Sequence, residues 1–93
     1  MDRAMNDDNQ HSLPEQRRLV QRLLSGSIPA GRELEVCRGV LAAPCDETTA
    51  FQALFTLLRG ALADPFFNID DTQLVVPILK AMARGELKAG DLL

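Results

Sequence analysis

Few side chains in this sequence of 93 residues could carry out acid–base or nucleophilic chemistry, because it contains one His, two Cys, no Trp and no Tyr. General acid–base catalysis needs a titratable group that is held close to its target. His11 lies in a polar N-terminal stretch that would not fix the position of its ring. Asp70 and Asp71 are adjacent, and neighbours at a helix start point in different directions, so we interpret them as capping residues. We therefore predict no catalytic residue and a protein that is not an enzyme.

The two cysteines differ in their expected surroundings. Cys37 falls on the apolar side of a predicted helix and is expected to be an inert core thiol. Cys45 directly precedes a predicted helix N-terminus, whose partial positive charge favours a thiolate. A thiol-based sensor acting through Cys45 is therefore one alternative function, although no His or Lys lies nearby in the sequence.

Patterns that bind metals or phosphates are missing from the sequence. It has no C-x-x-C, no H-x-x-x-H and no glycine-rich phosphate loop. Residues 68–72 resemble half of a calcium loop, but the central Gly and the terminal Glu that such a loop requires do not follow. We expect no metal site and no cofactor.

Charge and hydropathy limit the classes of partner. The net charge of −3 offers no general attraction for nucleic acid or anionic lipid. The longest wholly apolar run, residues 40–43, is far shorter than the ~20 residues that span a bilayer. Residues 1–12 contain no hydrophobic export segment and are expected to form a flexible acidic tail. We therefore expect a cytoplasmic protein without membrane contact, in which both thiols stay reduced.

Nucleic acid is the partner in a second alternative, because Arg17, Arg18 and Arg22 fall within the first predicted helix. Residues 23–34 also resemble the opening of winged-helix repressors of the GntR type, a similarity that implies DNA binding. The similarity covers about a dozen residues of common types. The helices that follow lack the Ser-Arg pair and the basic recognition positions of such domains, and residues 46–63 offer only Arg59. A DNA-binding regulator is therefore an alternative, and nucleic acid is not the expected partner.

Protein partners fit the sequence better. Phe66 and Phe67 follow a predicted helix, and adjacent residues at a helix exit seldom both point inward. Either one ring is an exposed anchor for a partner or both rings pack under the loop. Small residues beside Leu57 and Ala61 would allow another helix to approach closely, within the monomer or across a homodimer. We assign Phe66, Phe67, Leu57 and Ala61 as the candidate partner-binding residues.

Helical periodicity supplies the elements that position these residues. It predicts four helices over about residues 13–24, 31–43, 46–63 and 70–84, and no segment alternates as a strand would. Ser12, Asp46 and either Asp70 or Asp71 are the expected N-caps of the first, third and fourth helices. Pro77 either kinks the fourth helix or marks a helix that begins only near Val76.

Two similar stretches, residues 23–31 and 82–90, are expected to end helices in the same way. In each of them a Gly adopts the left-handed turn, and an apolar residue beyond it folds back onto the last helical turn. Gly26 precedes Ile28 in the first stretch, and Gly85 precedes Leu87 in the second. The last two leucines are expected to dock as a short turn or to fray.

The third predicted helix is too apolar for a surface position. Its apolar and small residues span about 220° of the circumference, whereas a surface helix needs a stripe of roughly 100°. Only Gln52, Thr56, Arg59 and Ala63 remain for solvent. We predict a compact all-α domain over residues 13–93, resembling a four-helix bundle with this helix at its centre. The function we infer is a small adaptor, chaperone-like or regulatory protein that acts through an apolar helical surface.

Overall fold

The computed structural model describes residues 13–26, 28 and 31–93, and the predicted tail and the predicted cap Ser12 lie outside this part. Within it the chain forms only helices, so the predicted all-α class is confirmed. The helices are α2 (Leu13–Leu24), α3 (Arg32–Ala42), α4 (Glu47–Ala63), α5 (Ile69–Ala83) and α6 (Ala89–Leu92).

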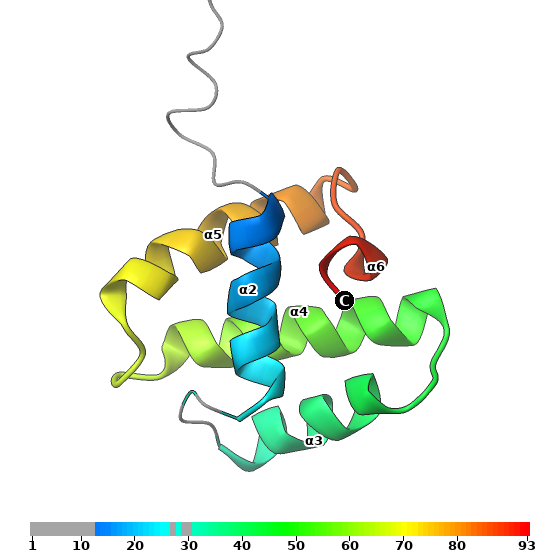
Figure 1. The fold of residues 1–93 in the computed structure, drawn as a ribbon, viewed down its shortest axis with the longest axis horizontal. Coiled ribbons are helices and arrows are strands. Elements are labelled where there is room, and N and C mark those ends of the chain that lie inside the picture. The colour runs from blue at the N-terminus through cyan, green and yellow to red at the C-terminus, as the bar shows by residue number, and fades with distance from the viewer. Residues whose placement is uncertain (1–12, 27, 29–30) are drawn as a thin grey trace, which may run out of the picture.

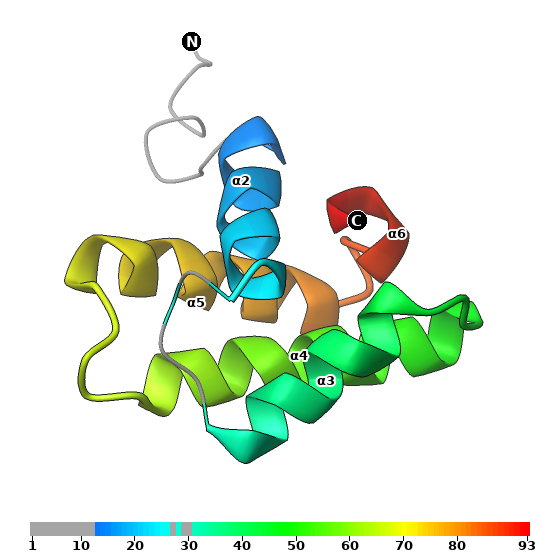
Figure 2. The same ribbon diagram turned by 60° about the horizontal axis from the view of Figure 1, so that its bottom comes forward.

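The helices surround one hydrophobic core. α4 packs against α3, α5 and α6, while α2 packs against α3, α5 and α6. Two views show α4 and α5 running side by side in opposite directions, with α2 crossing them and α6 near the start of α4 (Figures 1 and 2). The last helix is short and closes the end of the domain at which α4 begins.

The prediction that α4 is the central helix is confirmed. Leu54, Leu57, Leu58 and Ala61 are all fully buried on it, because helices cover it from several directions. Of the four residues expected in solvent, Gln52, Arg59 and Ala63 are exposed, and Thr56 is half-buried. The width of the apolar pattern therefore predicts how completely a helix is enclosed.

α3 and α4 pack tightly at a residue without a side chain. A Cβ atom built on Gly60 would lie 2.2 Å from Cδ2 of Leu34, a side chain that is itself only 4% exposed. The missing side chain lets Leu34 of α3 pack directly against the backbone of α4.

Gly60→Ala is therefore expected to lower the free energy of unfolding by about 1–3 kcal/mol, the usual cost of overpacking a core, although alanine favours a helix over glycine. Gly39→Ala is the matched control, because Gly39 lies inside α3 with no neighbour within 4 Å of the added carbon. That control should stabilise the protein by about 0.5–1 kcal/mol through helix propensity alone. Urea denaturation measures both changes, and a stabilising Gly60→Ala would contradict the close packing.

The helix ends follow local capping chemistry. Asp46 caps α4 as predicted, and its carboxylate accepts the N–H of Thr49 at 3.1 Å. Hydrogen bonds from Thr49 hold the pKa of the Asp46 carboxyl below its ordinary value. The predicted cap at Asp70 or Asp71 is wrong, because Asn68 occupies that position and accepts the N–H of Asp70 at 2.7 Å. The amide oxygen of Asn68 caps α5 two or three residues earlier than expected.

Both glycine stops behave as predicted. Gly26 and Gly85 have φ angles of 77° and 78°, in the left-handed region. The N–H of Gly85 donates to the carbonyl of Met82 at 3.1 Å, and the N–H of Glu86 donates to the carbonyl of Ala81 at 2.9 Å. These two bonds close the last turn of α5 and direct the chain back toward the core.

The structure decides two alternatives that the sequence leaves open, the start of the fourth helix and the conformation of the last residues. α5 is continuous through Pro77, so the proposal that it begins near Val76 is wrong. The last residues form a helical turn, α6, in which Ala89 and Leu92 are fully buried and Leu93 is 44% exposed. The bundle therefore has four long helices and a short fifth one within the described residues.

Candidate protein-docking surface

The two adjacent phenylalanines after α4 point in opposite directions. Phe66 is 82% exposed, whereas Phe67 is 8% exposed and belongs to the core. Of the two predicted partner-binding rings, only Phe66 can touch another protein, and Phe67 is corrected to a core residue. Sequence reasoning left this choice open, because either ring could have turned inward.

A hydrogen-bonded turn determines which ring is outside. The carboxylate of Asp64 accepts the N–H of Phe66 at 2.8 Å, and the carbonyl of Asp64 accepts the N–H of Phe67 at 3.1 Å. An Asp side chain that bonds the backbone two residues later forms an Asx turn. The turn fixes the backbone beneath Phe66, while Phe67 anchors the same segment in the core.

Ile69 adds to the exposed apolar surface at this end of the domain. It is the first residue of α5 and is 73% exposed. We call Phe66 and Ile69 the apolar tip. Large apolar side chains this exposed are the residues that typically anchor protein contacts when they gather at one place.

The flank containing Leu57 and Ala61 is not available to a partner. Both side chains are fully buried inside the monomer. Their assignment as partner-binding residues is therefore wrong, because the close approach that small residues allow occurs between helices of the same chain. The direct contact of Leu34 with Gly60 is an example of this close approach.

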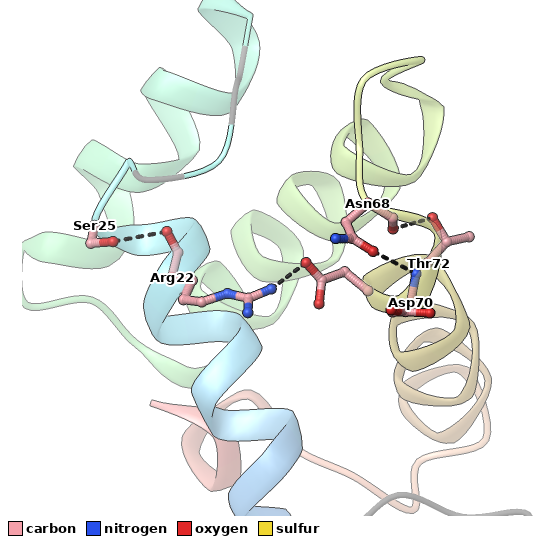
Figure 3. Close-up of polar contacts among 6 residues, drawn as sticks. Arg22, Ser25, Asn68, Asp70 and Thr72 are labelled. Atoms are coloured by element: carbon pink, nitrogen blue, oxygen red, sulfur yellow. Dashed lines mark hydrogen bonds and ion pairs between the residues drawn. The ribbon is translucent and has the colours of Figure 1, made fainter.

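Two of the three arginines of α2 contact other helices, and the third lines a hollow beside acidic side chains. Nε of Arg17 donates to the carbonyl of Asp91 at 2.7 Å, which ties α2 to α6. Arg22 forms an ion pair with Asp71 of α5, beside the Asn68 cap and the Thr72 hydroxyl (Figure 3). Arg18 lines a hollow that also contains Arg22 and three acidic side chains, Glu15, Asp70 and Asp71. Acidic groups thus accompany the arginines that the nucleic-acid alternative requires, which weakens the attraction of this face for phosphates.

Arg38 has a structural role that the sequence did not reveal. Its guanidinium reaches from α3 to the carbonyls of Leu23 and Ile28, the second at 3.0 Å. The carbonyl of Leu23 lies in the last turn of α2, where intrahelical partners are missing. Arg38 therefore completes the end of α2 and joins it to α3.

The two thiols differ in exposure, and the predicted burial of Cys37 is confirmed. Cys37 is buried in the core and Cys45 is exposed before α4. Burial, with a smaller contribution from the charge of Glu33, raises the pKa of the Cys37 thiol above its ordinary value. No ionisable or nucleophilic partner of Cys45 emerges from the described contacts that would support a redox role.

We expect Cys45 to react with iodoacetamide at pH 8 at least about tenfold faster than Cys37, because reaction requires an accessible thiolate. Mass spectrometry of peptides after timed quenching measures the two rates. Unfolding the chain in urea should bring the rates together. Equal rates in the folded protein would contradict the burial of Cys37.

A second apolar feature lies at the opposite end of α4 and α5. It is a hollow of about 270 Å³ that opens to solvent. We call it the end hollow, and it is lined by Glu47, Thr48, Phe51, Met82, Gly85, Leu87 and Lys88. The ring of Phe51 packs beside that of Phe55, with centroids 6.0 Å apart. The hollow cannot be recognised from the sequence alone, because its lining comes from segments more than thirty positions apart.

Other kinds of site do not emerge within residues 13–26, 28 and 31–93. There, no three His, Cys, Asp or Glu side chains are grouped so that they could hold a metal ion. None of the helices described is both long enough and apolar enough to cross a membrane. The apolar tip and the end hollow are two apolar features that could recognise another molecule. Comparison with protein-family models, curated proteins and solved structures finds no match to this chain.

Proposed function

We propose that this chain is a small, non-enzymatic adaptor or regulatory protein that binds another protein through its apolar tip. The single observation that carries the proposal is the 82% exposure of Phe66 beside a buried Phe67. A ring left in water forgoes about 1.5–3 kcal/mol that its burial would provide. Contact with a partner would recover that free energy.

The rigidity of the turn supports this proposal. Asp64 holds the backbone of Phe66, and Asn68 caps the helix that begins at Ile69. Both tip residues therefore extend from backbone that is fixed before a partner arrives. A preorganised contact loses little conformational entropy on binding, so a small surface can contribute usefully to affinity.

The composition of the described core supports a binding role rather than catalysis. The core contains no buried polar or charged residue among those described. Cys37 is a titratable group of this core, and its raised pKa keeps it as a weakly reactive thiol. The free thiols of Cys37 and Cys45 are compatible with a reducing compartment, and the proposal places the protein in the cytoplasm.

Site-specific photo-cross-linking tests the proposal. A benzophenone side chain at position 66 is expected to give one discrete adduct in cells that produce the chain natively. The same group at position 73 is the matched control, because Gln73 is exposed on α5 and lies outside the tip. If the partner is a different protein, excess unlabelled wild-type protein should suppress the adduct, and excess Phe66→Ala should not.

The mass of the adduct identifies the kind of partner. Twice the chain mass indicates a second copy, and any other mass indicates a different protein. Absence of an adduct at position 66, or equal adducts at positions 66 and 73, would overturn the proposed function.

A further inference from the structure

We infer that a second copy of this chain fits the apolar tip, with Phe66 of one copy inserting into the end hollow of the next. The inference rests on the proposed function, because it takes Phe66 as the docking residue and names its partner. It joins two features that the fold of each copy leaves separate.

The end hollow suits an aromatic ring in size and in lining. Met82, 2% exposed, forms apolar wall, and half-buried Phe51 and Leu87 lie beside it. Its volume of about 270 Å³ exceeds the roughly 150 Å³ of an apolar cavity that accepts benzene. A ring entering beside Phe51 would also meet an aromatic neighbour, and such pairs are favourable in offset or edge-to-face arrangements.

The tip and the hollow lie at opposite ends of the same helix pair. The tip is at the connection from α4 to α5, and the hollow is at the first turn of α4 and the last turn of α5 (Figure 1). The 17 residues of α4 rise about 25 Å between these ends. A copy therefore cannot insert Phe66 into its own hollow. Contacts between unlike surfaces build open chains or rings rather than two-fold dimers.

Charge supports the same head-to-tail direction. Asp64 and Asp70 flank the tip, although Arg22 of α2 pairs with the neighbouring Asp71 and offsets part of the negative charge there. The rim of the hollow carries Lys88, and Lys80 lies in the last turn of α5. Glu47 is also on the rim and offsets part of this positive charge. Lys88 is the cation on the rim that Asp70 of the next copy could approach. The acidic end of α5 would thus meet the basic end of the α5 in the neighbouring copy.

Sedimentation equilibrium of the purified full chain, up to about 1 mM, tests the inference, because contacts this small are typically weak and transient. Wild-type protein should show a weight-average mass that rises with concentration. Phe66→Ala removes the inserting ring, and Thr48→Trp fills the hollow from its exposed rim. Each variant alone should stay at the monomer mass.

A mixture of the two variants is the decisive arm. Phe66→Ala keeps an open hollow and Thr48→Trp keeps the ring, so the mixture should form a one-to-one pair and nothing larger. Gln21→Trp is the control, because it adds the same side chain at an exposed position of α2 away from both features. It should associate as wild type does, and circular dichroism should show that all variants are folded.

The named outcomes separate the inference from the proposed function. A strictly monomeric wild-type chain overturns the inference, while a cross-link from position 66 to a different protein would still uphold the proposed function. Self-association of Thr48→Trp alone, or a mixture that remains monomeric while wild type associates, also overturns the head-to-tail contact. Self-association that Phe66→Ala does not reduce overturns it as well, and absence of any adduct at position 66 overturns the proposed function itself.

Discussion

Phe67→Ala is expected to lower the free energy of unfolding by about 3–5 kcal/mol, the usual range for removing a buried aromatic ring. Phe67 is 8% exposed and belongs to the core cluster, although it lies in the short connection between α4 and α5. The truncation would leave a cavity beneath a turn that the Asp64 hydrogen bonds keep from collapsing. Chemical denaturation with urea, followed by circular dichroism at 222 nm, measures the change.

The neighbouring substitution Phe66→Ala is the matched control. It removes the same ring from the adjacent residue, which is 82% exposed. Exposed positions usually change the free energy of unfolding by no more than about 0.5 kcal/mol. Similar losses for the two variants would contradict the opposite orientations of the rings, on which the proposed function depends.

Leu92→Ala is expected to lower the free energy of unfolding by about 2–5 kcal/mol, although Leu92 lies one residue from the end of this sequence. Leu92 is fully buried, and its helix α6 packs against α2 and α4. The hydrogen bond from Arg17 to the carbonyl of Asp91 reinforces the same attachment. Thermal unfolding monitored by calorimetry gives the change.

Leu93→Ala is the corresponding control, because Leu93 is 44% exposed. The two variants remove the same number of atoms from consecutive positions. If α6 were only loosely attached, both would leave the unfolding temperature unchanged. That result would contradict the finding that the last turn closes the core.

Local patterns explain which parts of the fold could be predicted from the sequence. The apolar residues of α4 recur with the helical period around most of its circumference, so its central position follows from residue types alone. The Asp46 cap and the turns at Gly26 and Gly85 also depend on residues within one helical turn. Each of these features is encoded by neighbours along the chain.

Features that depend on distant segments could not be predicted in the same way. α6 has four residues, too few to show a helical period, and it is positioned by burial of Ala89 and Leu92 against other helices. Arg38 carries no sequence signal for its contact with the end of α2, which lies 15 positions away at Leu23. The pattern of charges likewise does not reveal that Arg22 pairs with Asp71.

The candidate site likewise combines features encoded by neighbouring residues with features that depend on distant segments. Two adjacent phenylalanines at a helix exit indicated that one ring could be exposed, but their types are identical. The choice of Phe66 comes from the Asx turn at Asp64 and from the space that the core leaves for Phe67. The end hollow brings together the start of α4 and residues 82–88, which lie more than thirty positions apart, so it becomes visible only in three dimensions.

The most direct test of the docking function is a titration with the partner that position 66 cross-links. Isothermal titration calorimetry should compare wild-type protein with Phe66→Ala, after both are shown to unfold at the same temperature. The loss of an anchoring ring at the centre of a contact is expected to weaken binding at least about tenfold. Equal affinities for wild-type protein and Phe66→Ala would contradict the assignment of the exposed ring as the docking residue.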